Sequence, residues 1–358
     1  MKVFYFRVGN GYGGLENFAK NLISEVLSID PSIEYTIFVD GNDFSYREEF
    51  LKLGCKIELI ADSHRNPIKF YYDLKSVLSQ APSDSVIQLN ICTFRNGLLF
   101  KACKESKLKT IVVGHYTKVD DGILPFLHKI NSKKYSKNFI CVSNSDDVSR
   151  FMFPDIDNPV FIDNGISQKR FKFSPEDRQL IREKYELSSF VIGQIGRICD
   201  TKNQLFSVKV VEKLNQKGFD CQLVLIGKEF ENDTREYVEG NKIENVKFVG
   251  PVYSGIEKFY SAFDVCLLPS KNEGMSLSLL ESASNGVDAI FSTAVPQIKV
   301  KCDNLTYLEL DEELWAEKII EISKKTGVNR KSPLQGTVYD LTECAKSYIR
   351  LYKDSTNI

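Results

Sequence analysis

Two glutamates in the second half of the chain, Glu273 and Glu281, are the residues whose type and spacing point most directly to chemistry. A buried strand is expected over residues 264–269, followed by a glycine-containing turn and a helix that holds Glu281 two turns after its start. Such a turn presents backbone N–H groups at a helix N-terminus, where an anion can bind. The two carboxylates can accept hydrogen bonds from hydroxyl groups. The pattern therefore suits a ligand with phosphate beside hydroxyls, such as a nucleotide sugar.

A pair of cations, Arg197 and Lys202, follows a strand expected over residues 190–196. Arginine offers a planar fork of donors to phosphate oxygens and lysine a compact point charge, so the two could converge on a diphosphate. The ordinary interpretation of such a pair is two solvated loop cations. Their position at the carboxyl end of a strand, in the same half as the glutamates, favours a binding role.

The chain has three histidines, and one of them follows a strand. His115 comes directly after the strand expected over residues 110–114, at the edge of the sheet where ligands of open α/β folds bind. We therefore treat His115 as a candidate for contact with substrate. His64 and His128 lie in polar or helical surroundings and are expected on the surface.

A glycine-rich loop, Gly9–Gly14, lies between the first strand and the first helix and fits G-x-G-x-x-G. Asp40 closes the second strand, where a ribose-binding acid sits in dinucleotide-binding folds. Three interpretations stay open: the dinucleotide site of an oxidoreductase, another phosphate site, or a plain turn. The second half supplies no evident acid or base for hydride transfer, which counts against the oxidoreductase.

Short apolar runs alternate with longer amphipathic stretches, as a parallel sheet covered on both faces requires. In the first half, strands are expected over residues 2–8, 35–40, 56–60, 86–91, 110–114 and 138–143. This alternation of strand and helix patterns stops over residues 164–175. In the second half it resumes, with strands expected over residues 190–196, 221–227, 246–249, 264–269 and 288–293. We predict an α/β protein of two doubly wound domains, with a cleft lined by the carboxyl ends of both sheets.

Composition narrows the class of protein. The 358 residues are 27% charged with a formal net charge of −1, so charge predicts no nucleic-acid partner. Nine cysteines without a C-x-x-C pair favour reduced thiols in a cytosolic protein over disulfides or a zinc site. No stretch reaches the about 18 apolar residues of a membrane-spanning helix. Asp155 and Asp157 are expected in a turn and not at a metal.

The region between Arg95 and Lys137 is locally basic, with ten Lys and Arg against three Asp and Glu. It is either a solvated face or a surface for anionic membrane lipids, to which each nearby cation contributes about 1 kcal/mol. No nucleic-acid motif accompanies it. The expected location is the cytoplasm, either free or at the inner face of the membrane.

The order and spacing of these motifs make the chain resemble the retaining, nucleotide-sugar-dependent glycosyltransferases of the GT-B fold, family four, over nearly its whole length. The landmarks are Gly13-Gly14-Leu-Glu16, His115, Val142-Ser143, Asn164-Gly165-Ile166, Gly196-Arg197 with Lys202, Tyr260-Ser-Ala-Phe-Asp264 and the Glu-x7-Glu block up to Gly286. The resemblance implies two facing Rossmann-like domains. Residues 1–168 would form the acceptor side, with the terminal helix of 338–358 packing back on it, and residues 169–337 the donor side.

The resemblance also implies roles for the residues of the second half. Glu281 would accept hydrogen bonds from the ribose hydroxyls. Glu273 would hold the hydroxyls of the donor sugar and steady the charge that develops at the anomeric carbon. The diphosphate would be held by Arg197 and Lys202 together with the backbone N–H groups of Met275 and Ser276.

In the first half, the resemblance implies that His115 contacts the donor sugar and that Gly13 and Gly14 border the phosphates and the acceptor. Two cations and a helix N-terminus can neutralise the leaving diphosphate without a metal ion or other cofactor. The implied reaction is transfer of a hexose from a nucleotide-diphosphate sugar, UDP-sugar favoured, to a glycan or lipid-linked acceptor in surface polysaccharide biosynthesis. The alternatives are an NAD-dependent oxidoreductase using Gly9–Gly14 and a non-catalytic nucleotide-sugar binding protein of the same fold.

Overall fold

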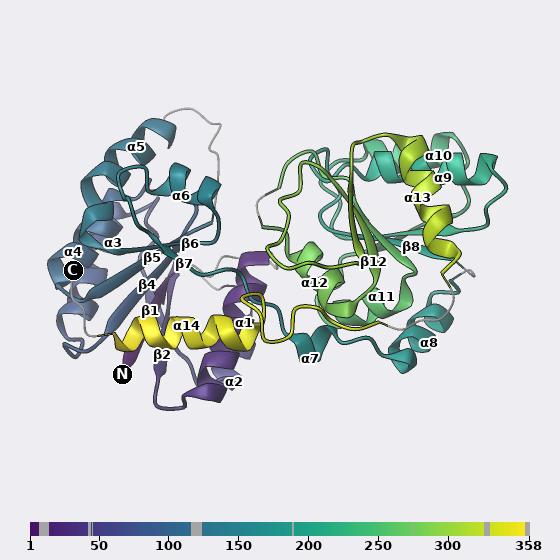
Figure 1. Ribbon diagram of the computed structural model, residues 1–358. Helices are drawn as coiled ribbons and strands as arrows, with labels where there is room; N and C mark the ends of the chain where they lie inside the picture. The colour runs from purple at the N-terminus through teal and green to yellow at the C-terminus, as the bar shows by residue number, and fades with distance from the viewer. Residues whose placement is uncertain are drawn as a thin grey trace. The chain divides into compact units, whose positions relative to one another are not determined.

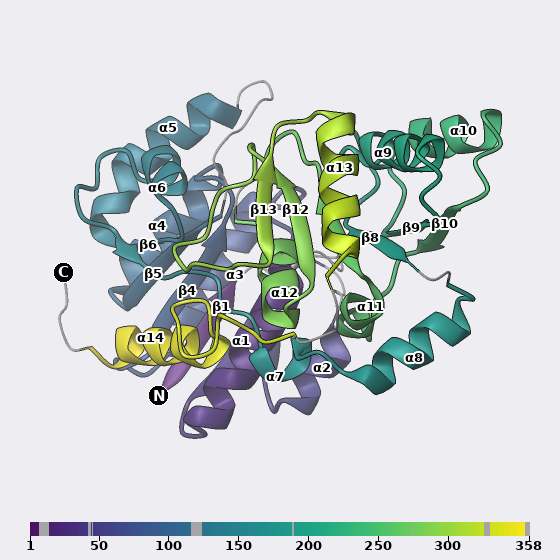
Figure 2. The same cartoon turned by 45° about the vertical axis from the view of Figure 1, so that its right-hand side comes forward.

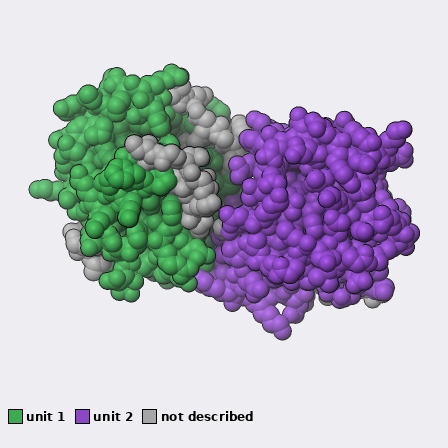
Figure 3. Space-filling view, turned by 90° about the horizontal axis from the view of Figure 1, so that it is seen from above, with its two compact units in different colours: residues 1–165, 341–358 green, residues 166–340 purple. Residues whose placement is uncertain are grey.

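The computed structural model describes residues 1–6, 14–41, 44, 46–115, 124–187, 190–273, 275–325 and 330–354. The chain divides into two compact units (Figure 3). Unit 1 contains residues 1–165 and 341–358, and unit 2 contains residues 166–340. The boundaries expected from the sequence, after residues 168 and 337, lie close to these.

Unit 1 is built on a seven-stranded parallel sheet with the order β3-β2-β1-β4-β5-β6-β7 (Figure 1). Its strands are β1 (Lys2–Phe6), β2 (Glu34–Asp40), β3 (Lys56–Ile60), β4 (Val86–Ile91), β5 (Lys109–Gly114), β6 (Ile140–Ser143) and β7 (Val160–Phe161). Every residue of β4 is buried, as expected of a central strand covered on both faces. The strand order reverses between β1 and β4, so the carboxyl ends of the central strands form the switch point of this sheet.

Helices cover both faces of the unit 1 sheet. They are α1 (Gly14–Ile29), α2 (Arg47–Lys52), α3 (Pro67–Ser79), α4 (Gly97–Ser106), α5 (Leu124–Tyr135), α6 (Asp146–Met152) and α14 (Leu341–Lys353), with a short 3₁₀ turn at Ser136–Asn138. The last of them, α14, lies beside α1 and contributes Cys344, Ala345, Tyr348 and Tyr352 to the core on that face (Figure 1). The carboxyl-terminal segment therefore folds as part of unit 1.

Unit 2 repeats the architecture with a six-stranded parallel sheet in the order β10-β9-β8-β11-β12-β13 (Figure 2). Its strands are β8 (Val191–Ile195), β9 (Gln222–Ile226), β10 (Val246–Gly250), β11 (Val265–Leu268), β12 (Asp288–Ser292) and β13 (Leu305–Leu308). The helices are α7 (Gln168–Phe171), α8 (Pro175–Lys184), α9 (Gln204–Gln216), α10 (Asp233–Gly240), α11 (Ile256–Ala262), α12 (Leu277–Asn285) and α13 (Glu312–Ser323). The reversal of strand order lies between β8 and β11.

These two units confirm the predicted α/β fold with doubly wound parallel sheets. The sequence pattern missed β7 and β13, which are short strands at sheet edges. It also placed the start of the last helix at residue 338, whereas α14 begins at Leu341. Within the described residues, no helix is long and apolar enough to cross a membrane.

A candidate active site in unit 2

The switch point of unit 2 brings together two segments that are far apart in the sequence. Strands β8 and β11 pair directly, with Val265 opposite Ile192 and Cys266 opposite Gly193. The loop after β8 carries Arg197 and Lys202, and the loop after β11 carries Glu273. Because parallel strands end at the same edge of a sheet, the topology places these loops side by side.

Lys202 and Glu273 meet at this edge. The Lys202 ammonium forms an ion pair with Oε1 of Glu273, and both side chains are largely buried, at 16% and 12% exposed. The hydroxyl of Ser270 donates a second hydrogen bond to the same oxygen, at 2.7 Å. Burial favours this pair over competing water contacts, so the carboxylate is held in one orientation.

The loop that carries Lys202 is fixed by two buried glutamines. Gln194, on β8, donates from its side chain to the carbonyl of Lys202 at 2.8 Å. Gln204 donates to the carbonyl of Arg197 at 2.9 Å and accepts from the backbone N–H of Cys199 at 3.2 Å. These bonds within the protein hold the loop in one conformation.

The turn from β8 into this loop requires glycine. Gly196 has φ of +155°, a region that residues with a side chain rarely adopt. A Cβ atom on the neighbouring Gly227 would lie 1.9 Å from the carbonyl oxygen of Gly196. The two strand ends can approach this closely only because Gly227 has no side chain, and this approach places Arg197 at the tip of the sheet.

Arg197 itself is exposed and does not join the Lys202–Glu273 pair. Its guanidinium lies over the ring of Phe230, 5.8 Å from the ring centroid. The ring restricts the arginine without neutralising its charge. Arg197 therefore remains available to an anionic ligand on the surface of the loop.

Glu281 lies on α12 and is 6% exposed. Its Oε2 accepts a hydrogen bond of 2.6 Å from the hydroxyl of Tyr260, which is 1% exposed. Burial raises the pKa of Glu281 above its ordinary value, while the hydrogen bond from Tyr260 and the charge of Arg170 act to lower it. One expectation needs correction here: α12 begins at Leu277, so Glu281 lies one turn into the helix and not two.

Met275 and Ser276 precede α12, and Ser276 is its N-cap. The side chain of Ser276 makes no capping hydrogen bond. Among the described residues, no acceptor is found for the backbone N–H of Met275 or of Ser276. The start of α12 therefore offers backbone donors and the positive end of the helix dipole to an anion.

In unit 1, His115 lies at the carboxyl end of β5 and is partly buried. Its Nε2 lies 3.3 Å from Oδ1 of Asn90, on the neighbouring strand β4. The amide nitrogen of Asn90 donates to the carbonyl of Phe6 at 3.4 Å, which leaves Oδ1 as the acceptor for His115. The contact therefore requires a proton on Nε2.

The glycine loop is only partly described. Gly14 is exposed and begins α1, whereas Gly9–Gly13 lie outside the described residues. Asp40 accepts hydrogen bonds from the backbone N–H and the hydroxyl of Ser63, the first at 2.6 Å. This carboxylate closes a loop of the fold, which disfavours the ribose-binding role of a dinucleotide site.

His128 was expected on the surface, and this prediction is wrong. The ring is 5% exposed and stacks on Phe151, with ring centroids 4.5 Å apart. Its Nδ1 accepts from the backbone N–H of Phe94 at 3.1 Å, and its Nε2 lies 3.0 Å from the carbonyl oxygen of Phe151. Burial lowers the pKa of His128. His64, in contrast, is exposed as expected and contacts Arg95.

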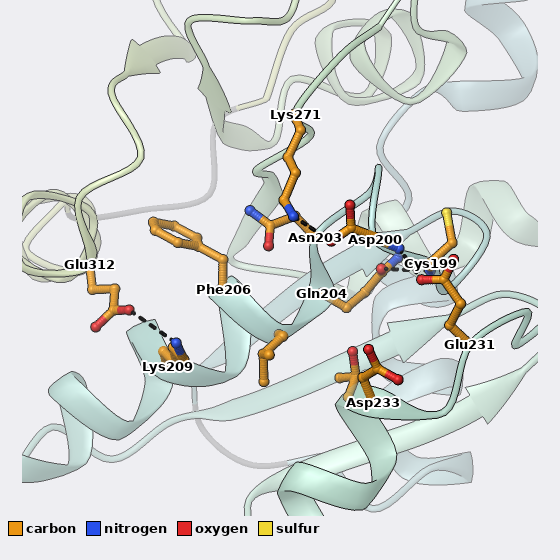
Figure 4. A pocket seen from close by; sticks show the side chains of 12 residues that line it. Cys199, Asp200, Asn203, Gln204, Phe206, Lys209, Glu231, Asp233, Lys271 and Glu312 are labelled. Carbon is orange, nitrogen blue, oxygen red and sulfur yellow. Dashed lines mark hydrogen bonds and ion pairs between the residues drawn. The ribbon is translucent and has the colours of Figure 1, made fainter. Parts of the chain in front are cut away.

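A pocket of about 250 Å³ lies beside the loop that carries Lys202, and Asn203 and Lys271 are among the residues that line it (Figure 4). Acidic and basic side chains share its wall, among them the pairs Asp200–Lys271 and Glu312–Lys209. Neither Lys202 nor Glu273 lines it. Over the described part of the chain, no cluster of His, Cys, Asp and Glu is arranged to hold a metal ion, and Asp155 and Asp157 lie in a turn.

Comparison with known proteins shows which family this chain is similar to. Residues 189–325 match the family model described as glycosyl transferases group 1. EpsF of Bacillus subtilis (strain 168), named as a glycosyltransferase, is 24% identical over 99% of this chain and 97% of its own length. The crystal structure of Anabaena HepE in complex with UDP and glucose aligns with a TM-score of 0.71 at 14% identity, covering 98% of this chain and 99% of HepE. These comparisons support a group 1 glycosyltransferase, and the fold is that of the GT-B glycosyltransferases.

The glycosyltransferase is also similar to CapH of Staphylococcus aureus, a capsular polysaccharide biosynthesis glycosyltransferase. The two are 24% identical over 94% of this chain and 87% of CapH. The family match lies within unit 2 and includes the loops that carry Lys202 and Glu273 and the helix that carries Glu281. It confirms the glycosyltransferase prediction over the oxidoreductase.

Sequence reasoning gave no role in the two sites to three residues that the structure places there. Ser270 and Tyr260 hold the two glutamates, and Asn90 contacts His115. Position at a strand end was a usable signal for Ser270 and Asn90. Tyr260 had no such signal, because its contact with Glu281 depends on how α11 packs against α12.

Proposed function

We propose that this glycosyltransferase moves a hexose from a nucleotide-diphosphate sugar, with UDP as the favoured nucleotide, and retains the configuration at the anomeric carbon. The acceptor is a glycan or a lipid-linked glycan of a surface polysaccharide. The observation that carries the proposal is the meeting of Lys202 with Glu273 at the switch point of unit 2. The ribose-binding carboxylate, Glu281, stands on the helix that follows.

The chemistry requires the leaving diphosphate to be neutralised as the glycosidic bond breaks. Arg197, Lys202 and the N–H groups at the start of α12 supply positive charge and donors fixed in advance of the reaction. Glu273 is placed to hold the sugar hydroxyls and to balance positive charge at the anomeric carbon. In retaining transfer by front-face attack, an oxygen of the donor phosphate takes the acceptor proton, so the protein supplies no separate base. We propose that this set works without a divalent metal.

The names of similar proteins support the choice of substrates. HepE is known in complex with UDP and glucose, and CapH is named for capsular polysaccharide biosynthesis. Both agree with a UDP-sugar donor and a polysaccharide acceptor.

A thermal-shift screen with UDP, GDP, ADP and CMP sugars tests the donor site. A ligand present at 100 times its Kd adds about 2.7 kcal/mol to the free energy of unfolding, which such a screen detects. We expect the largest shift with a UDP-sugar, undiminished by EDTA. Transfer should be lost in Arg197→Ala and Glu273→Ala, and NMR of the product should show the anomeric configuration of the donor. A shift with none of the donors, or unchanged transfer in both variants, contradicts the proposal.

We further propose that unit 1 docks on an anionic membrane surface through one face of α5. Phe126 and Ile130 are exposed by 62% and 46%, and they lie one helical turn apart. The lysines at 129, 133 and 134 are exposed on the same face, because the spacings of three and four residues repeat along a helix. The opposite face, with His128, Ser132 and Tyr135, is buried.

The chemistry of this face fits lipid headgroups. No Asp or Glu occurs between residues 124 and 145, and within the described chain the three lysines have no ion-pair partner. Exposed apolar side chains flanked by unpaired lysines are typical of helices that lie in a membrane interface.

Sedimentation with vesicles tests the docking. We expect binding to phosphatidylcholine vesicles only when they contain phosphatidylglycerol. The variant Lys129→Glu/Lys133→Glu/Lys134→Glu should weaken that binding by on the order of 100-fold. The matched control, Lys52→Glu/Lys172→Glu/Lys324→Glu, reverses three exposed lysines elsewhere and should bind as the wild type does. Equal loss in both variants would mean that only net charge matters.

A further inference from the structure

We propose that Tyr260 is a positioning residue for Glu281, and that it sets the carboxylate to accept from the ribose so that the enzyme distinguishes ribonucleotides from deoxyribonucleotides. The inference rests on the proposed function, in which Glu281 meets the ribose. It assigns a role to a residue of α11 that has no direct place in the donor site.

In the carboxylate of Glu281, one oxygen is held by a hydrogen bond and the other has none among the described residues. The terminal torsion of a glutamate is soft, so the plane of a free carboxylate turns easily. Here the hydroxyl of Tyr260 donates to Oε2 at 2.6 Å, the length of a strong hydrogen bond to an ionised acceptor. No hydrogen bond to Oε1 is found among the described residues. One bond therefore defines the plane and directs Oε1 as the acceptor for a ligand.

Tyr260 is itself held on several sides. Its ring packs edge-on against Phe171 and Phe263, with centroids 5.8 and 6.2 Å away. Its carbonyl accepts from the guanidinium of Arg330 at 3.0 Å. Because both the ring and the backbone are fixed, the hydroxyl is a rigid reference point for the carboxylate.

The electrostatics give a second readout of the same contact. Burial raises the pKa of Glu281, and the bond from Tyr260 opposes that rise. A hydrogen bond to the charged form stabilises it, so removing the hydroxyl should raise the pKa of Glu281 further. Nucleotide binding needs the ionised carboxylate. On acidification, the variant without the hydroxyl should therefore lose binding at a higher pH than the wild type does.

The test compares Tyr260→Phe with the wild type in binding of UDP and of 2′-deoxy-UDP, or of the GDP or ADP pair if the wild type prefers that base. We expect the wild type to prefer the ribonucleotide by on the order of tenfold. In Tyr260→Phe the preference should fall to roughly twofold, with the acid limb of binding moved to higher pH. Tyr307→Phe, on the edge strand β13, removes a hydroxyl from the same unit and should change neither quantity.

Two results would overturn the inference. One is a Tyr260→Phe protein that keeps the wild-type preference and pH profile. The other is equal weakening of ribonucleotide and deoxyribonucleotide with no change in the pH profile, which indicates a structural role only. Failure of the wild type to bind UDP, GDP or ADP is a different outcome, because it contradicts the proposed function itself.

Discussion

Lys202 and Glu273 form a largely buried ion pair across the switch point of unit 2, although 71 positions separate them in the sequence. The pair joins the loop after β8 to the loop after β11. In the proposed function, a diphosphate would share the Lys202 ammonium with Glu273. The cation and the carboxylate of the proposed donor site therefore restrict each other.

The first prediction concerns Glu273. Glu273→Gln keeps an acceptor for Ser270 but removes the charge that pairs with Lys202. We expect kcat to fall by roughly 10²–10³-fold, because a charge aimed at the reacting centre is lost, with a smaller change in UDP binding. Steady-state transfer assays and calorimetry measure the two quantities. Glu244→Gln, at an exposed residue in the turn before β10, is the control and should behave as the wild type does. Full activity of Glu273→Gln would remove this residue from the mechanism.

The second prediction concerns the cost of burying Glu281. Its pKa is raised in the folded protein, so the folded state binds a proton more tightly than the unfolded chain does. The resulting stability is present at low pH and is lost as the pH rises through the raised pKa. Glu281→Gln should therefore melt at a higher temperature than the wild type at neutral pH, with the difference shrinking on acidification. The same variant should bind UDP weakly.

Two measurements check whether Glu281→Gln gains stability and loses UDP binding. They are melting curves between neutral and acidic pH and UDP titrations at neutral pH. Glu257→Gln, which breaks the part-buried pair with Arg170, is a useful comparison because it should destabilise. A Glu281→Gln protein that is less stable than the wild type at neutral pH would contradict the expectation.

The third prediction concerns His128 in unit 1. Burial lowers its pKa, so the unfolded chain binds a proton more readily than the folded protein. The free energy of unfolding should therefore fall as the pH decreases through the ordinary titration range of histidine, about 6.5 and below. His128→Phe should remove this contribution. It should also cost about 2–3 kcal/mol, because the N–H of Phe94 and the carbonyl of Phe151 lose their partner.

Urea denaturation at several pH values tests this effect. His64→Gln changes an exposed histidine and should leave both the stability and its pH dependence unchanged. The same pH dependence in His128→Phe as in the wild type would show that another group is responsible.

The fourth prediction concerns the attachment of α14 to unit 1. The hydroxyl of Tyr352 bonds to Oε1 of Gln88 on β4 and accepts from the hydroxyl of Tyr35 on β2 at 3.1 Å. All three side chains are buried, so Tyr352→Phe leaves polar groups unsatisfied and should cost about 1–3 kcal/mol. Tyr72→Phe, at a residue that is 63% exposed, should change stability by less than about 0.5 kcal/mol. Chemical denaturation followed by fluorescence compares them, and equal stability of the two variants would mean that the buried bonds contribute nothing.

Most of the secondary structure was predictable because its signals are local. Central strands such as β11 are continuous apolar runs, and amphipathic stretches marked α1 and α3. The edge strand β13 was not predicted, because its four residues are each only partly buried and form no clear apolar run. The sequence pattern placed the start of α12 too early, because residues that favour helices follow the turn directly and the boundary has no sharp signal.

By itself, the sequence determined the α/β fold and placed Arg197, Lys202, Glu273 and His115 at strand ends, because polar residues that follow a buried strand must emerge at the edge of the sheet. Only the tertiary structure decided which of them meet. The Lys202–Glu273 pair depends on the adjacency of β8 and β11, and the bond from Tyr260 to Glu281 on the packing of α11 against α12. The burial of His128 likewise follows from its contacts with Phe94 and Phe151. These contacts join residues 71, 21 and 34 positions apart, and no local periodicity specifies them.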